Sequence, residues 1–303
     1  MRDTPVAEYT RLEPGQVAEV GELLAAATDA DGVSPLSEHV LLHLRHGGDV
    51  EARHLLARVD GRLVGYAHLD VTDLVEGSSA EMAVHPGYRR HGLGRALLEN
   101  LLADTPDGRL RLWAHGEHPG AVALAAAYGF RRSRVLWQMR RSLYAPVPRS
   151  EYPPDVTVRP FRVGTDEERW LAVNNRAFAR HPDQGRWTVA DVRAREAEPW
   201  FDPAGFFLAE REGELVGFHW TKVHGAGDHE HEPIGEVYVV GVDPSAQGTG
   251  LGTALVLTGL LHLRAAGLAE VMLYVDESNR GAVRVYEKLG FTHWDTDVTF
   301  RHP

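Results

Sequence analysis

The feature that most constrains this chain is a turn sequence that occurs twice. Residues 84–94 (VHPGYRRHGLG) and 242–252 (VDPSAQGTGLG) each run from an apolar strand end through a proline turn to closely spaced glycines. Gly92 and Gly250 hold the same place in the two copies, 158 residues apart. Each copy also ends in a Gly-Phe pair, and these pairs are 161 residues apart. A nearly constant offset over this distance indicates two copies of one domain within the 303 residues.

A proline-rich segment separates the two copies. Residues 144–154 contain four prolines, and this composition favours an extended, semi-rigid linker. Residues 156–160 (VTVRP) then have the pattern of the first strand of a new domain. We therefore predict an N-terminal domain over residues 1–145 and a C-terminal domain over residues 152–303, each long enough to bury its own core.

The same order of elements is predicted in both copies. Helices come first, followed by a two-strand hairpin around Asp-Gly at 60–61 or Glu-Gly at 212–213, pairs that suit tight hairpin turns. A strand then leads into the glycine turn and a helix, after which a strand, a short helix and a final strand close the copy. The expected helices are 15–28, 36–46, 93–103, 166–179, 188–196 and 251–266, and the expected strands are 54–59, 62–70, 79–84, 109–114, 206–211, 214–222, 235–242 and 270–275. This mixture predicts an α/β fold with helices on both sides of a sheet.

Composition narrows the classes of function. The chain has 43 acidic and 32 basic residues, a formal net charge of −11, which argues against a generic binder of nucleic acid or anionic membranes. It has no cysteine, so disulfides, thiolate nucleophiles and thiolate metal sites are excluded. The first residues form no apolar signal segment, and no stretch of about 18 apolar residues occurs. We expect a monomeric cytoplasmic protein without a membrane segment.

The repeated glycine turn has the pattern of a phosphate cradle. A strand, a glycine-rich turn and a helix start offer unpaired N–H groups and the positive end of a helix dipole to an anion. A Walker loop requires Gly-Lys-Ser/Thr, which neither copy has. A dinucleotide fingerprint requires a third glycine, but Leu97 and Leu255 fill that position. The alternative is that the glycines serve only a tight turn between strand and helix.

The turns and their surroundings resemble the GCN5-related N-acetyltransferase superfamily. Its acyl-CoA signature, Arg/Gln-x-x-Gly-x-Gly/Ala, occurs at 89–94 and again at 247–252. Its later element, Asn-x-x-Ala-x-x-x-Tyr-x-x-x-Gly-Phe, occurs at 279–291. The resemblance implies two tandem acetyltransferase domains, each a mixed, mostly antiparallel sheet flanked by helices. It also implies acetyl-CoA as the co-substrate.

The two copies differ in the residues that this superfamily uses for proton transfer. Glu236 lies on the strand before the second turn and Tyr286 on the late helix, positions that commonly supply the base and the acid. With the 158-residue offset Glu236 corresponds to Ser78, and counting back from the Gly-Phe pair Tyr286 corresponds to Ala125. Glu81 lies nearby, but period two places it on the opposite strand face. We therefore predict a catalytic C-terminal domain and an N-terminal domain that is not catalytic.

A narrower resemblance is to the mycothiol synthase family. It rests on 219–224 (HWTKVH), 235–244, 273–276 (LYVD) and 279–291 in the second half, and on 28–35 in the first. The resemblance implies transfer of acetyl from acetyl-CoA to the cysteinyl amine of cysteinyl-glucosaminyl-inositol (desacetylmycothiol), giving mycothiol and CoA. It also implies that the amine attacks the thioester directly, with Glu236 as base through a water and Tyr286 as acid.

The same resemblance implies binding residues in both halves. The acetyl-CoA positions of the second half are Val240, Gly241, Val242, Gln247, Gly248, Thr249, Gly250, Leu251, Gly252, Thr253, Asn279, Arg280, Gly281, Ala282, Val283 and Arg284. A second acetyl-CoA site is implied at Met82, Ala83, Val84, Arg90, His91, Gly92, Leu93, Gly94 and Arg95. The acceptor positions are Glu38, Asp183, Lys222, Glu236, Tyr274 and Tyr286. Because Glu38 comes from the first half, a role for it in substrate binding predicts an active site between the domains.

Three alternatives stay open on the sequence. The histidines and acidic residues at 224–232 could suggest a metal site, but their irregular spacing lacks a metal-binding scaffold, so we interpret the segment as a solvated loop and expect no metal. The acceptor could be another amine, such as an aminoglycoside. A third possibility is a non-catalytic acetyl-CoA sensor, although such a sensor needs neither Glu236 nor Tyr286.

Overall fold

The computed structural model describes residues 5–47, 52–73, 76–179, 187–225 and 232–303. The chain forms two compact units, and each is described by itself. The first unit contains residues 1–137, 276–278 and 295–303, and the second contains 138–275 and 279–294. The units therefore do not follow the chain order at its end, because the last residues of the chain belong to the first unit. The proline-rich segment 144–154 lies within the second unit.

The first unit is built on a mostly antiparallel sheet with strand order β1-β2-β3-β4-β5-β12. Only β4 and β5 run parallel among these neighbours, and the end of β12 pairs antiparallel with β5, joining Val298 to Ala114 and Arg301 to Arg111. The strands are β1 Val6–Tyr9, β2 Arg53–Val59, β3 Arg62–Asp70, β4 Ser78–Val84, β5 Leu110–Ala114 and β12 Thr292–Arg301. The sequence did not predict β1, which pairs antiparallel with β2 at the edge of the sheet.

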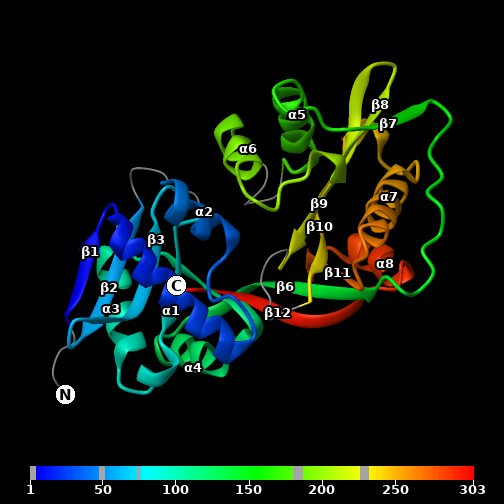
Figure 1. Ribbon diagram of the computed structural model, residues 1–303. Helices are drawn as coiled ribbons and strands as arrows, with labels where there is room; N and C mark the ends of the chain where they lie inside the picture. Colours follow the sequence, from blue (N-terminus) through cyan, green and yellow to red (C-terminus); the bar gives the residue numbers. More distant parts are fainter. Residues whose placement is uncertain (1–4, 48–51, 74–75, 180–186, 226–231) are drawn as a thin grey trace. The chain divides into compact units, whose positions relative to one another are not determined.

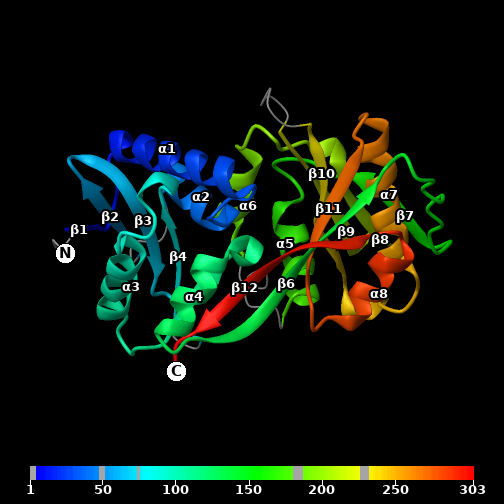
Figure 2. The same cartoon turned by 90° about the horizontal axis from the view of Figure 1, so that it is seen from below.

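Helices cover both faces of this sheet, as Figure 2 shows. α1 (Pro14–Asp31) and α2 (Glu38–His46) pack on one face, where their apolar side chains surround Leu56 and Tyr66 of the sheet. On the other face lie α3 (Leu93–Asp104) and α4 (Pro119–Ala127), whose leucines and alanines form the larger core of the unit.

The second unit repeats this plan with strand order β6-β11-β10-β9-β8-β7. The strands are β6 Arg131–Ser142, β7 Val156–Pro160, β8 Phe206–Arg211, β9 Glu214–His224, β10 Ile234–Val242 and β11 Glu270–Asp276. Residues 131–137 of β6 and the last residue of β11 are counted with the first unit. The helices are α5 Glu167–Ala177, α6 Val189–Glu196, α7 Leu251–Ala265 and α8 Arg280–Lys288. In Figure 1, α5 and α6 lie on one side of β9 and β10, and α7 lies on the other. The predicted α/β fold of two tandem copies, each with a mixed sheet and flanking helices, is confirmed.

Both predicted hairpins form at the predicted turns. Asp60 and Gly61 have φ of 50° and 82°, and Glu212 and Gly213 have φ of 53° and 83°. Two successive left-handed residues are the signature of a type I′ turn, whose twist matches that of the flanking strands. The turns join β2 to β3 and β8 to β9 in antiparallel register.

The faces of the second sheet are packed differently. On the α5 and α6 face, Trp170 and Trp220 are fully buried and pack edge to face against each other, with ring centroids 5.7 Å apart. On the other face α7 comes so close to β9 that a Cβ on Gly259 would lie 2.0 Å from the His219 ring. A residue larger than glycine at 259 would push α7 away from the sheet.

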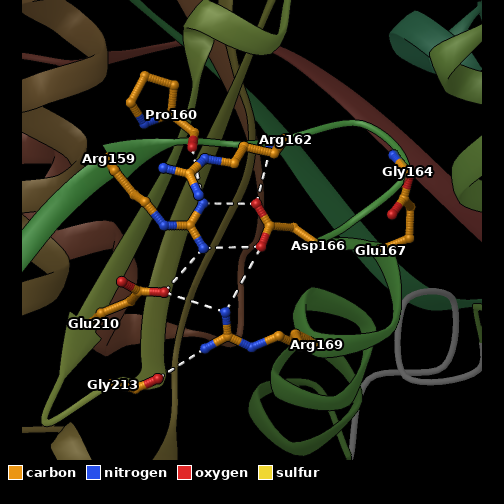
Figure 3. A network of polar contacts seen from close by, with 9 residues as sticks. All are labelled: Arg159, Pro160, Arg162, Gly164, Asp166, Glu167, Arg169, Glu210 and Gly213. Atoms are coloured by element: carbon orange, nitrogen blue, oxygen red, sulfur yellow. Dashed lines mark hydrogen bonds and ion pairs between the residues drawn. The ribbon is translucent and has the colours of Figure 1, made fainter.

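A partly buried ion network around the buried Asp166 fastens the start of α5 to β7 and β8, as Figure 3 shows. The guanidinium of Arg159 donates two hydrogen bonds to the Asp166 carboxylate, at 2.6 and 2.8 Å, and a third to Glu210 at 2.9 Å. Asp166 also accepts from the backbone N–H of Arg162 at 2.9 Å, and Arg169 adds a second cation. Hydrogen bonding from Arg159 holds the pKa of Asp166 below its usual value against the effect of burial. The carboxylate is therefore ionised and fixes α5 over the sheet.

In the part of the chain that the structure describes, no helix combines the length and apolar character needed to cross a membrane.

Candidate active site

Hydrogen bonds to Asp243 fix the start of the second glycine turn, and the space beside its two glycines is open. The buried Asp243 accepts hydrogen bonds from the backbone N–H of Ser245 at 3.0 Å and its hydroxyl at 2.7 Å, and Arg176 donates to it at 2.7 Å. Burial alone would raise the pKa of Asp243, but these donors outweigh it and keep the pKa below its usual value. Gly248 and Gly250 follow with φ of 77° and 84°, and nothing lies within 4 Å of where their Cβ atoms would be.

The start of α7 fits a phosphate group. Gly250 is the N-cap and supplies no side-chain acceptor to the first-turn N–H groups of the helix. Those groups, on Leu251 to Thr253, have no carbonyl partner within the helix. With the open backbone at the two glycines, they form a concave set of donors at the positive end of a helix dipole. The residues present therefore fit the pyrophosphate of an acyl-CoA.

The strand that leads into this turn aims two N–H groups away from β9. The N–H of Asp243 donates to Val216 of β9 at 2.9 Å. Because successive N–H groups of an antiparallel strand alternate in direction, those of Val240 and Val242 face the β11 side, and that of Gly241 faces β9. The parallel ladder to β11 lies earlier, at Gly235 and Glu236. Of the predicted residues 240–242, the first and last can therefore donate to a carbonyl oxygen beyond that ladder.

Three predicted acceptor residues share one face of the sheet. Glu236 of β10 lies opposite Lys222 of β9 and beside Met272 of β11. Tyr274 is two residues beyond Met272, so it faces the same side. Glu236 is 7% exposed, and Tyr274 is 38% exposed with its hydroxyl accepting from Gln138 at 2.8 Å. The face combines a buried carboxylate, an ammonium and a phenol.

The Glu236 carboxylate and the Lys222 ammonium have different partners. Glu236 Oε2 lies 2.6 Å from Nε2 of His224. The Lys222 ammonium lies 4.4 Å from the centre of the Trp200 ring and 5.2 Å from that of Tyr238. The quadrupoles of the two aromatic rings stabilise the ammonium that lies over them. The rings also form an apolar surface beneath this part of the site.

Tyr286 is placed by α8. Asn279 caps this helix by accepting from the N–H of Ala282 at 3.2 Å, and the Tyr286 ring packs against Phe291 with centroids 5.8 Å apart. Burial raises the pKa of the Tyr286 phenol to about 12. The phenol is therefore protonated at neutral pH, as an acid in catalysis must be.

Two predicted acceptor residues are not placed beside the others. Asp183 lies outside the described residues, as does 226–231 of the segment interpreted as a loop. Glu38 is the first residue of α2 in the first unit and is described there alone. Among the described residues, no group of three or more histidine or acidic side chains is arranged to hold a metal ion.

The register of the two copies corrects one sequence prediction. β10 contains a bulge between Val237 and Val239, and the first copy has no equivalent in β4. One extra residue in β10 shifts the correspondence, so Glu236 matches Ser79 and not Ser78. Glu81 therefore lies on the same face as the matching position, and the predicted opposite face is wrong. A bulge reverses the face of every residue before it relative to an unbulged copy.

Glu81 is nevertheless fully engaged. Its two oxygens accept from the N–H and the hydroxyl of Ser37, at 2.5 and 2.7 Å, and His115 Nε2 lies 3.6 Å away. His115 Nδ1 in turn lies 3.0 Å from Asp297 of β12. Burial alone would raise the pKa of Glu81, but His115 and Ser37 lower it below its usual value. Ala125, at the place of Tyr286, is buried and carries no proton donor.

The first glycine turn keeps the shape of the second. The Arg89 guanidinium donates to the carbonyl of Val84 at 3.1 Å, as the side-chain amide of Gln247 donates to that of Val242 at 3.3 Å in the second turn. Arg89 also donates to both oxygens of Asp31 at 2.7 Å. Gly92 has a φ of 88°, and the N–H of His85 donates to β3 as that of Asp243 does to β9. The first unit therefore has the shape of an acyl-CoA cradle without the predicted acid and base.

Sequence reasoning missed His224, Trp200 and Tyr238. His224 was assigned to a solvated loop, yet it is the last residue of β9. The signal that could have found it is the alternation Trp220, Lys222, His224, which places all three on one strand face. Trp200 and Tyr238 carried no such signal, because Trp200 lies in an irregular segment and Tyr238 lies in the bulge of β10.

The comparisons with known proteins agree with this geometry. Residues 168–291 match the model described as "Acetyltransferase (GNAT) family", and residues 51–132 match "Acetyltransferase (GNAT) domain". A tandem GNAT protein from the clavulanic acid biosynthesis pathway has the same fold, with a TM-score of 0.76, 20% identity and 98% of each chain covered.

Two relatives are much closer in sequence. A mycothiol acetyltransferase of Streptosporangium roseum is 56% identical, over 96% of this chain and 97% of the relative. A mycothiol acetyltransferase of Acidothermus cellulolyticus is 57% identical, over 97% of this chain and 94% of the relative. With both halves and the tandem order matched along nearly its whole length, the chain belongs to the mycothiol acetyltransferase family of GNAT proteins.

Proposed function

We propose that this chain transfers the acetyl group of acetyl-CoA to the cysteinyl amine of cysteinyl-glucosaminyl-inositol, giving mycothiol and CoA. The observation that carries the proposal is the position of Glu236. It is a buried carboxylate on β10, immediately before the bulge, the two outward N–H groups and the open glycine turn. Full-length relatives that are 56% and 57% identical and are named mycothiol acetyltransferase support the choice of acceptor.

The acyl donor binds along β10 and its turn. The turn and the first turn of α7, residues 247–253, hold the pyrophosphate through backbone N–H groups. The start of α8, residues 279–284, lines the rest of the CoA arm. The N–H groups of Val240 and Val242 donate to the thioester oxygen and polarise its carbonyl. Such fixed donors stabilise the negative charge that develops on this oxygen in the transition state.

The transfer needs two proton movements. Glu236 removes one proton from the substrate ammonium through a water, and the free amine attacks the thioester carbon. The carbon–sulfur bond then breaks, and the CoA sulfur takes the phenolic proton of Tyr286. The second proton of the amine nitrogen restores the phenol, and Glu236 returns its proton to water. The products are the amide, free CoA and one proton.

The acceptor lies over the face that carries Lys222 and Tyr274. Lys222 donates to a hydroxyl or carbonyl oxygen of the acceptor, and the half-exposed phenol of Tyr274 packs against its sugar and donates to it. We assign Asp183 and Glu38 to the same acceptor on the sequence match alone. In this proposal, acetyl-CoA is bound mainly by backbone N–H groups, and the acceptor is bound mainly by side chains.

The N-terminal domain, over residues 1–145 of the repeat, has a second acetyl-CoA site that does not turn over. The site is supported by the shape of the first glycine turn, which matches the second. The lack of turnover is supported by the engagement of Glu81 by Ser37 and His115 and by alanine at the place of Tyr286. Catalysis belongs to the C-terminal repeat, over residues 152–303.

The experiment is turnover of acetyl-CoA measured by mass spectrometry. The acceptors are cysteinyl-glucosaminyl-inositol, a panel of aminoglycosides and simple amines, each with the unaltered chain and with Glu236→Gln. We expect efficient N-acetylation of the cysteinyl substrate and a large loss of rate in the variant. Turnover confined to other amines would overturn the acceptor, and no turnover with acetyl-CoA still bound would overturn the activity.

A further inference from the structure

We propose that His224 is a positioning residue for catalysis, which holds the Glu236 carboxylate in the orientation that accepts the substrate proton. This inference rests on the proposed function and adds a residue to it. It is carried by a short contact, 2.6 Å between His224 Nε2 and Glu236 Oε2, in which the carboxylate is buried and the imidazole side chain is 34% exposed.

The strand register brings the two side chains together. Ile234 of β10 lies opposite His224 of β9, and Glu236 lies opposite Lys222. His224 and Glu236 are therefore diagonal neighbours on one face, a spacing that long side chains can bridge. Both strands are antiparallel at this point and pair without a shift from residue 234 to 237. The contact is set by the sheet itself.

The direction of the hydrogen bond follows from the chemistry. A general base must be ionised before it accepts a proton, and an ionised carboxylate has only acceptors, so the proposal requires the proton of His224 on Nε2, where it is donated to Oε2. A donor of this kind to a charged acceptor gives a short and strong bond. Fixing Oε2 also fixes the plane of the carboxylate and therefore the direction of Oε1. In the proposed mechanism, Oε1 accepts the proton from the water that relays it from the substrate ammonium.

Lys222 explains why such a holder is needed. A lysine directly opposite a glutamate is a natural ion partner, but the Lys222 ammonium lies over the rings of Trp200 and Tyr238. Without the imidazole, Glu236 can turn toward that ammonium. Its oxygens would then be aimed along the sheet and away from the reacting amine, and Lys222 would be withdrawn from its own place.

The test uses His224→Leu, which removes the donor, and His224→Gln, which keeps an N–H donor on a side chain of similar reach. We expect His224→Leu to lower kcat by about ten- to a hundredfold, as misplacement of a catalytic group does. The KM for acetyl-CoA should stay within about twofold, since the residues of the turn are unchanged. His224→Gln should recover most of the lost rate.

A double-mutant cycle separates positioning from a structural role. If His224 acts through Glu236, His224→Leu costs nothing further in a chain that already carries Glu236→Gln. An equal loss of rate in both backgrounds overturns the proposal, as does equal activity of the Leu and Gln variants. Thermal unfolding of each variant shows whether the chain remains folded.

A readout without turnover keeps this test apart from that of the acceptor. Two-bond proton–nitrogen NMR of the histidine rings, assigned through His224→Gln, reports the tautomer of His224. We expect a protonated Nε2 whose signals move in Glu236→Gln, and unchanged signals overturn the proposal. If the unaltered chain acetylates another amine, the proposed acceptor is wrong and the cycle is run on that amine.

Discussion

Replacing His115 by glutamine should remove a strongly pH-dependent contact of the first unit. The imidazole lies between two buried carboxylates, 3.0 Å from Asp297 and 3.6 Å from Glu81. Burial alone would lower the pKa of His115, but Asp297 and Glu81 outweigh this effect and raise it to about 10. The folded unit therefore holds an imidazolium at neutral pH.

The size of the effect follows from linkage. A pKa of about 10 in the folded unit, against about 6.5 in the unfolded chain, corresponds to about 5 kcal/mol of stability. Because the folded pKa is the higher one, this contribution is fully present below pH 6.5 and is lost as the pH rises through 10. From the same two pKa values, about 4 kcal/mol remains at pH 7 and about 1 kcal/mol at pH 9. His115→Gln should therefore cost several kcal/mol at pH 7 and much less at pH 9.

Hydrogen exchange measured by mass spectrometry resolves this contact from the rest of the chain. Peptides that cover residues 110–117 and 295–303 report the local free energy of opening, after correction for the intrinsic exchange rate. His293→Gln, at an exposed histidine near the start of β12, is the control and should leave both peptides unchanged. If the unaltered chain and His115→Gln differ by the same amount at pH 7 and pH 9, His115 is not the bridging cation and the reasoning is refuted.

Three further predictions concern the second unit and the paired turns. Asp166→Ala should lower the free energy of unfolding in urea by about 3–5 kcal/mol, because it leaves the Arg159 network without its central carboxylate. The control Asp155→Ala, at a half-exposed surface pair, should cost under about 1 kcal/mol. Equal effects of the two substitutions would contradict the network. Tyr286→Phe should lower kcat by about a hundredfold with the KM for acetyl-CoA unchanged in steady-state kinetics, and an unaltered kcat would remove Tyr286 as the acid. Gly250→Val should raise the KM for acetyl-CoA at least about tenfold, because the glycine has a φ of 84° and lies in the turn that we propose to hold the pyrophosphate of CoA, whereas Gly92→Val, at a φ of 88°, should leave turnover within about twofold. Equal losses in the two glycine variants would show that the first unit takes part in turnover.

Local signals in the sequence were sufficient for much of the fold. The pairs at 60–61 and 212–213 require left-handed backbone that few residues adopt, so they identify both hairpins. The glycine turns are identified in the same way, because the conformation depends on the residue itself. The end of β12 shows the limit of such signals. In each copy the strand before the short helix can pair with a further strand. The sequence of residues 295–301 contains no signal that shows which of these two strands they pair with.

The bulge at Tyr238 explains the error at the candidate site. A constant offset of 158 residues assumes that both copies place one residue at each position of the strand. The extra residue in β10 leaves the offset intact at Val242 but shifts it by one at Glu236. A bulge leaves no mark in the amino-acid composition of a strand. Simple alternation of side chains along the strand therefore assigns Glu81 to the wrong face of the sheet. Only the pairing with β9 and β3 shows the difference.

The two buried glutamates differ in how completely their oxygens are engaged. In the first unit, Glu81 accepts from Ser37 at both oxygens and lies beside the His115 imidazolium, which joins it to Asp297 of β12. A carboxylate with hydrogen-bond donors at both oxygens contributes to the stability of the fold, and this arrangement fits the proposal that the first unit is not catalytic. In the second unit, the partner of Glu236 among the described residues is one imidazole at Oε2. A single donor orients a carboxylate without consuming its second oxygen, and this is the condition that a general base requires.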